Sequence, residues 1–144
     1  MIGFRVIMNA DIAAQKAFDR LDRVGFDALA EKEKTVATVW RFVGKVANEG
    51  LRRFFSSSAG DLAFYAPTAL RDIGAFKMAE IAAKANEIFG AEGPPRDRKV
   101  RRELVRAFTK EVIKKLEALE APFYDCSDDV DELLEKYVNK DRAS

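Results

Sequence analysis

The residues that could carry chemistry in this chain are carboxylates, hydroxyls and one thiol, because the sequence has no histidine and a single cysteine, Cys126. Histidine is the commonest general base and metal ligand near neutral pH, so its absence excludes Ser-His-Asp triads, Cys-His pairs and ordinary zinc sites. The acidic neighbours Asp125, Asp128 and Asp129 disfavour a reactive thiolate at Cys126. We therefore expect an ordinary thiol that is buried or half-buried.

The densest group of carboxylates is the acidic segment DCSDDVDELLE, residues 125–135. Its spacing does not fit an EF-hand loop, which needs a glycine at the turn and a glutamate at the twelfth position, so no metal site is predicted. Two carboxylates could act as general acid and base, but the sequence marks out no pair. The pattern instead indicates a helix start, with Ser127 or Asp128 as the cap and the following acidic residues beside the positive end of the helix dipole.

Basic residues recur at every fourth position in the preceding segment. This basic ridge consists of Arg98, Arg102, Arg106, Lys110 and Lys114. On one helix the five cations would line a face about 24 Å long. Such a face could follow nucleic-acid phosphates, with Lys99 and Arg101 widening it, although no interleaved aromatic residue could stack on bases. The alternatives are a face in solvent, a face neutralised by the acidic segment, and a contact surface for an acidic protein.

Charge is unevenly distributed along the chain, although the whole sequence has a net charge of only +1. Residues 91–119 contain nine basic and five acidic residues, a net of +4, whereas residues 120–144 contain three basic and eight acidic residues, a net of −5. Neighbouring segments of opposite charge predict that surface electrostatics decides what this protein binds.

The stretch NEGLRRFFSSSAGD places two arginines directly beside two phenylalanines. The spacing of Leu51, Phe54 and Phe55 is helical, so these side chains can enter a core while Arg52 and Arg53 leave on the opposite side. The glycines at both ends allow sharp changes of chain direction. This stretch, called the corner below, is predicted to join packed helices, and its two arginines are candidates for partner binding.

Apolar residues recur with helical spacing almost throughout, and no convincing alternating strand is present. The prediction is an all-α, single compact domain of about six or seven helices, the longest near residues 96–119. Because Pro67 suits a first helical turn, a helix should begin near Ala66, after a tight turn.

The length of 144 residues favours one domain. We expect residues 1–10 to form an N-terminal arm or a short strand and residues 11–144 to form the helical domain. With 48% hydrophobic and 34% charged residues, and no long apolar run, the composition excludes a membrane protein and a disordered tail. The first residues lack the features of a signal peptide, so a cytoplasmic location is expected.

The corner also resembles a known motif, that of a bacterial all-helical domain of unknown function found in a DNA-mimic protein family. The family pattern runs roughly V-N-N-G-G-F-x-Q-F-F-x-N-S-S-G-D, and this sequence reads V-A-N-E-G-L-R-R-F-F-S-S-S-A-G-D. The matching positions are Val46, Asn48, Gly50, Phe54, Phe55, Ser58, Gly60 and Asp61. Flanking stretches, among them GFDALAEKEKTVATVWRFVGKV and LEALEAPFYDCSDDVDELLEKYV, extend the resemblance over residues 25–138.

The resemblance implies an all-α domain that can dimerise and has no known enzymatic activity or cofactor. In the DNA-mimic relative, acidic groups substitute for DNA phosphates, which requires a strongly negative protein. The net charge of +1 argues against mimicry here, except for a faint possibility in the final 25 residues. The Gln and second Asn positions of the motif are Arg53 and Ser57, so a shared polar site would be altered in this chain.

The sequence therefore predicts a non-enzymatic protein–protein interaction module that needs no metal or cofactor. Its partner is expected to be another protein, with a second copy of the chain as one candidate, and not a membrane. The predicted contact residues are the basic ridge together with Arg52 and Arg53. Nucleic-acid binding through the ridge is the alternative, and an enzyme that uses carboxylates and serines is a third hypothesis.

Overall fold

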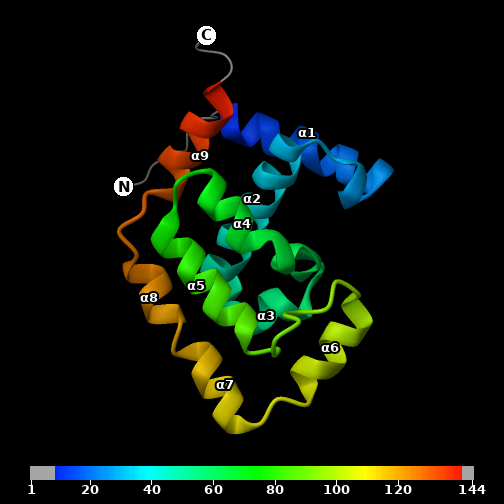
Figure 1. Ribbon diagram of the computed structural model, residues 1–144, viewed down its shortest axis with the longest axis vertical. Coiled ribbons are helices and arrows are strands. Elements are labelled where there is room, and N and C mark those ends of the chain that lie inside the picture. The colour runs from blue at the N-terminus through cyan, green and yellow to red at the C-terminus, as the bar shows by residue number, and fades with distance from the viewer. Residues whose placement is uncertain (1–8, 141–144) are drawn as a thin grey trace.

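The computed structural model describes residues 9–140, and all regular structure in this range is helical (Figure 1). The α-helices are α1 (Asn9–Val24), α2 (Glu31–Glu49), α3 (Leu51–Ser56), α4 (Ala66–Asp72), α5 (Phe76–Glu87), α6 (Arg98–Arg106), α7 (Lys110–Glu117), α8 (Glu120–Asp125) and α9 (Val130–Asn139). Two 3₁₀ helices join them, η1 (Phe26–Ala28) and η2 (Ser58–Tyr65). The prediction of an all-α domain is confirmed, and α4 begins at Ala66 as expected.

The arm or strand predicted for residues 1–10 lies outside the described residues, except that Asn9 and Ala10 already belong to α1. The expected tight turn before α4 is the end of η2. None of the helices described between residues 9 and 140 combines the length and the apolar composition needed to cross a membrane.

The prediction of one long helix near residues 96–119 is wrong, and the longest helix is α2. The segment divides into α6 and α7, which run in different directions at the lower end of the molecule (Figure 1). The break has a local cause, because the hydroxyl of Thr109 accepts a hydrogen bond from the N–H of Val112 (3.2 Å) and starts a new helix. This division, among others, raises the number of α-helices in residues 9–140 to nine, above the six or seven predicted.

Helix α2 runs through the middle of the fold and contacts α1, α3, α4, α9 and η2. A chain of edge-to-face aromatic rings connects it to the lower helices. Ring centroids are 5.1 Å apart for Phe42 and Phe54, 5.2 Å for Phe54 and Phe55, 4.8 Å for Phe55 and Phe89, and 5.3 Å for Phe89 and Phe108. Such pairs stabilise a core by about 0.5–1.5 kcal/mol each beyond the burial of their area. The two phenylalanines of the corner therefore belong to the core, as predicted.

Carboxylates near the end of the chain accept hydrogen bonds from the first turns of helices that are distant in sequence. These contacts satisfy N–H groups that have no partner inside their own helix, and they place negative charge at the positive end of each helix dipole. The pairs of carboxylate and backbone N–H are Glu135 with Ala10 of α1 (2.8 Å), Glu120 with Leu51 of α3 (3.0 Å) and Asp128 with Met78 of α5 (3.0 Å).

The start of α9 differs from the prediction in one residue. Asp129 is its cap and accepts from the N–H of Glu132 (3.1 Å). Asp128 instead accepts a hydrogen bond from the first turn of α5, and the hydroxyl of Ser127 accepts one from Nζ of Lys77 (2.8 Å). The acidic segment thus caps the starts of α1, α5 and α9, of which the sequence pattern revealed only the last.

Candidate binding surfaces

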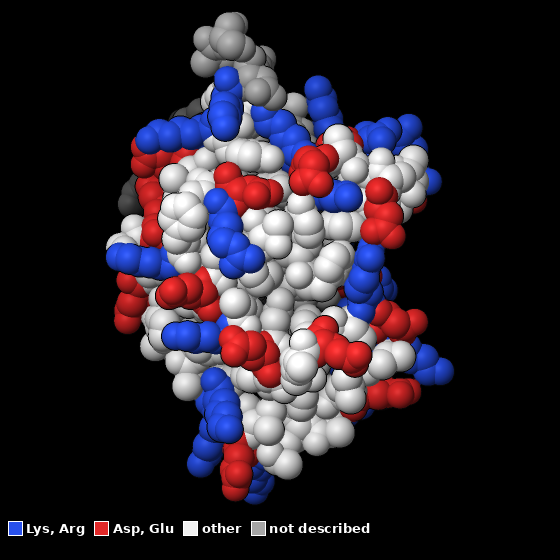
Figure 2. Space-filling view, in the orientation of Figure 1, with Lys and Arg blue, Asp and Glu red and all other residues white. Residues whose placement is uncertain are grey.

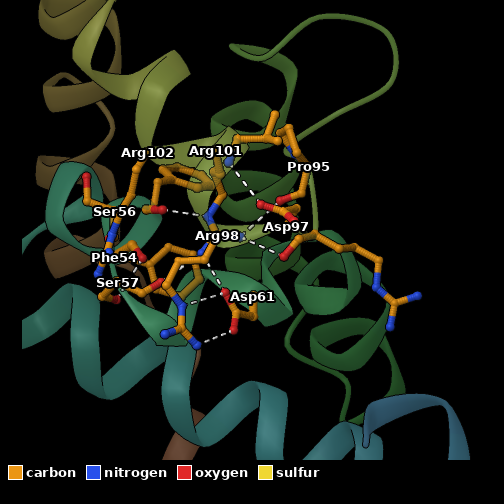
Figure 3. A network of polar contacts seen from close by, with 12 residues as sticks. Phe54, Ser56, Ser57, Asp61, Pro95, Asp97, Arg98, Arg101 and Arg102 are labelled. Atoms are coloured by element: carbon orange, nitrogen blue, oxygen red, sulfur yellow. Dashed lines mark hydrogen bonds and ion pairs between the residues drawn. The ribbon is translucent and has the colours of Figure 1, made fainter.

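Arg101 is the centre of the polar network that joins α6 to the corner (Figure 3). The side chain is fully buried, with 0% of its area exposed, so the prediction that it widens an exposed ridge is wrong. Its guanidinium group donates to four carbonyls and one carboxylate. The acceptors are the carbonyls of Phe55 (2.6 Å), Ser57 (2.8 Å), Pro95 (3.0 Å) and Arg96 (3.2 Å) and Oδ1 of Asp61 (2.7 Å).

Gly60 brings the corner close enough to reach this arginine. A Cβ atom at this position would lie 2.6 Å from the carbonyl oxygen of Phe54 and 2.9 Å from both the carbonyl oxygen of Phe55 and Nε of Arg101. Real Cβ atoms do not approach backbone atoms so closely, so only glycine fits without a shift of the chain.

Asp61, the next residue, forms ion pairs with two arginines of α6. Nη2 of Arg98 lies 2.7 Å from its Oδ2, and Nη2 of Arg101 lies 2.7 Å from its Oδ1. Partial burial acts to raise the pKa of Asp61, but the hydrogen bonds and charges of the two arginines outweigh it, so the pKa lies below its usual range. Gly60 and Asp61 therefore have a structural role, since they connect the corner to α6.

Helix α6 is oriented opposite to the expectation from its sequence. Arg98, Arg101 and Arg102 lie at i, i+3 and i+4 and face the corner, where Nε of Arg102 donates to the carbonyl of Ser56 (2.6 Å) (Figure 3). The apolar positions Val100 and Leu104 are instead 47% and 41% exposed. The helix therefore buries Arg101 together with Val105 and leaves Val100 and Leu104 in solvent.

The basic ridge is consequently not a single face. Arg98 is paired with Asp61 and Arg102 is bonded to the corner, whereas Arg106 is exposed at the end of α6. The remaining two cations, Lys110 and Lys114, are exposed on α7, beyond the break. In Figure 2 the lower end of the molecule has a broad uncharged area with lysine and arginine side chains at its left border.

The corner arginines are exposed, as predicted, on the side of α3 away from the buried phenylalanines. Arg53 approaches Glu49 only loosely, with 4.0 Å between Nη1 and Oε1. Ser56 connects the corner to α6, because its hydroxyl donates to the carbonyl of Arg52 (3.0 Å) while its own carbonyl accepts from Arg102. The fold thus places the corner next to the first half of the ridge.

Within residues 9–140 no group of three histidine, cysteine, aspartate or glutamate side chains is placed to hold a metal ion. Cys126 is a half-buried free thiol. Sequence reasoning missed two features, the burial of Arg101 and the outward face of α6. The resemblance at Gly60 and Asp61 was the available signal for the first, although it did not identify the arginine that binds there.

A family model described as DMP19-like protein matches residues 27–141, which is more than three quarters of the chain. The matched range contains the corner, α6 and the capping carboxylates, and it nearly coincides with the range of the resemblance found in the sequence. Comparisons with curated proteins and with solved structures gave no match. The chain therefore belongs to the DMP19-like protein family.

Proposed function

We propose that this protein is a non-enzymatic interaction module that binds another protein through the outer face of α6 and the cations beside it. The observation that carries the proposal is the exposure of Val100 and Leu104, one helical turn apart on the outer face of α6. Exposed aliphatic residues framed by charged residues are typical of protein contact surfaces. The neighbouring cations Lys99 and Arg106 are also exposed and favour an acidic partner.

Nucleic-acid binding is less well supported by this geometry. A duplex offers regularly spaced phosphates and is contacted best by a continuous row of cations. The break at Thr109 separates the ridge into two helices, and Arg98 is neutralised by Asp61. The exposed apolar pair Val100 and Leu104 adds nothing to phosphate binding.

The family takes its description from a DNA-mimic protein, yet mimicry is not proposed for this chain. A phosphate-like surface needs many free carboxylates, and the net charge here is +1. Among the acidic residues after residue 119, four accept hydrogen bonds from backbone N–H groups. They are Glu120, Asp128, Asp129 and Glu135.

Two variants test the proposal. The apolar variant carries Val100→Gln and Leu104→Gln, and the charge variant carries Arg106→Glu, Lys110→Glu and Lys114→Glu. Affinity capture from nuclease-treated lysate of the native host should recover a partner with the wild type and lose it with both variants, at unchanged circular dichroism. Val24→Gln is the matched control, because Val24 is 44% exposed on α1, and it should retain the partner.

The two variants also separate the alternatives. A retarded band in a low-salt gel shift that survives in the apolar variant and disappears in the charge variant would favour nucleic-acid binding. Capture that both variants leave intact would reject the proposed surface. A second copy of the chain remains a candidate partner, and sedimentation velocity would then show a dimer that the apolar variant dissociates.

We further propose that the protein works in the cytoplasm. The half-buried free thiol of Cys126 suits a reducing compartment. Fractionation of host cells with an antibody against the protein would test this location.

A further inference from the structure

Two neighbouring hollows on the surface of α2 form a continuous groove between α2, the end of α1 and η2. Their volumes are about 340 and 390 Å³, and both are lined by Arg41 and Ser58. The first hollow extends over Gly44 to Lys45, and the second extends to Arg96 and Arg98. This feature is called the α2 groove below.

Arg41 is the most informative residue of the groove. Its guanidinium carbon lies 4.4 Å from the ring centroid of Phe18, so the group is stacked on an aromatic face. Within residues 9–140 its side chain has no hydrogen bond and no ion pair, although it is half-buried. An arginine has five N–H donors and cannot lose its charge. A stacked guanidinium without an acceptor is oriented in advance to bind a carboxylate through two parallel hydrogen bonds.

The far end of the groove holds two further arginines in fixed positions. Arg96 stacks on Phe64, 4.3 Å from the ring centroid, and contacts the exposed carboxylate of Asp27 at 3.1 Å. Arg98 is held by Asp61, whose charge is shared with the buried Arg101. These contacts orient the guanidinium groups and leave several of their N–H donors unused.

The lining of the groove is therefore mainly positive. Its cations are Arg41, Lys45, Arg96 and Arg98, and its carboxylates are Asp22 and Asp61. Asp61 is neutralised by the arginines of α6, and Lys45 is paired with Glu49 on its own helix. The uncompensated charge lies where the two hollows meet, at Arg41.

Gly44 is one of the residues that line the first hollow. It lies in the interior of α2 without a positive φ, and apart from its chain neighbours and the backbone of α2, no described atom lies within 4 Å of the position of a Cβ. Glycine destabilises a helix interior relative to alanine, and no packing contact explains it here. Its effect is to leave the helix backbone open to a chain that lies in the groove.

We propose that the α2 groove binds an acidic peptide segment of a partner protein, with one carboxylate on the guanidinium group of Arg41 and its main chain passing over Gly44. Pockets for small molecules are enclosed and mostly apolar, whereas this groove is open and lined by several charged side chains. Planar guanidinium groups in the middle of the groove and at its far end match the planar carboxylates of glutamate and aspartate side chains. The groove is distinct from the outer face of α6, so either site can fail without the other.

Fluorescence anisotropy with a labelled octaglutamate peptide at low ionic strength tests the proposal. Arg41→Gln should weaken binding about tenfold or more, as expected for loss of a charge-assisted pair. Arg71→Gln makes the same charge change at an exposed position of α4, outside both the groove and the α6 face, and should alter the affinity by less than about twofold. Gly44→Gln fills the first hollow and should weaken binding while raising the midpoint of thermal unfolding, a combination that misfolding cannot produce.

Each other result would overturn the proposal. No binding by the wild type, equal losses for Arg41→Gln and Arg71→Gln, or unchanged affinity for Gly44→Gln would each show that the groove is not a peptide site. An unlabelled single-stranded oligonucleotide that competes far better than unlabelled peptide would identify a nucleic-acid site instead. The apolar variant of α6, which changes no charge, should keep its peptide affinity, which separates this outcome from failure of the proposed function.

Discussion

Replacing Arg101 by methionine should destabilise the fold strongly, although this residue looks like one of several surface cations in the sequence. The substitution keeps a long side chain in the buried position and removes the guanidinium group. Four carbonyl oxygens then lose a donor, and Asp61 retains only Arg98. The perturbation therefore tests whether the network around Arg101 holds α6 against the corner.

The magnitude follows from the acceptors that lose their partner. A buried polar group left without a hydrogen bond costs about 1–3 kcal/mol, and removal of one partner from a buried ionic network costs about 3–5 kcal/mol. The carbonyl of Ser57 also accepts from the N–H of Gly60 (3.1 Å), so the lower limit applies to it. We expect a loss of about 4 kcal/mol, which corresponds to a decrease of about 8–16 °C in the midpoint of thermal unfolding.

Urea denaturation followed by circular dichroism measures this loss, with Arg102→Met as the matched control. Arg102 is exposed and makes one hydrogen bond, to the carbonyl of Ser56, so its replacement should cost less than about 1 kcal/mol. Arg101→Lys should fall between the two, because an ammonium group keeps the charge but not the planar fork of donors. Equal destabilisation by Arg101→Met and Arg102→Met would refute the reasoning.

Four further substitutions test single positions. Gly60→Ala should cost about 2 kcal/mol or more by thermal denaturation, because its Cβ would collide with backbone oxygens; Gly44→Ala, with open space, should instead stabilise α2 by about 0.5–1 kcal/mol. Asp61→Asn should lower the free energy of unfolding at pH 7. Since the folded pKa of Asp61 is depressed, its charge stabilises the protein above its ordinary pKa of about 3.9, and the difference from wild type should shrink as the pH falls below that value. Thr38→Val removes a buried hydroxyl that has no partner in the described residues, and it should raise the free energy of unfolding by about 1 kcal/mol.

The part of the fold that could be predicted depends on local patterns. Apolar spacing within one helix predicted the burial of Phe54 and Phe55, and Pro67 indicated the start of α4. Both signals act within a few residues of the position that they predict. The same holds for the exposure of Arg52 and Arg53, which follows from the buried face of their own helix.

The part that could not be predicted depends on contacts between distant residues. A row of cations with apolar residues beside it predicts a helix that buries its apolar face. Helix α6 is instead rotated so that Arg101 is buried and Leu104 is exposed. The rotation is stabilised by carbonyls of the corner, which lies more than forty residues earlier in the chain. No periodicity within α6 reports the presence of those acceptors. The hydroxyl of Thr109, a residue type that caps helices, could have indicated the break. The apolar spacing across this position instead predicted that one helix continues through it.

The capping contacts explain where the acidic residues of the C-terminal part of the chain lie in the fold. Carboxylates of the acidic C-terminal part reach the first turns of α1, α3 and α5, so negative charge is drawn toward helix starts on several parts of the fold. The arginines of α6 differ in their contacts, because Arg101 is hydrogen-bonded to the corner and Arg106 is exposed to solvent. A nearly neutral protein thereby presents locally positive surfaces, one on α6 and α7 and one in the α2 groove. The acidic groups that could neutralise these surfaces within the molecule are bonded to helix ends, so the surfaces are available to an acidic partner. Loss of a capping carboxylate such as Glu120 should therefore lower the stability of the fold before it changes the binding of a partner.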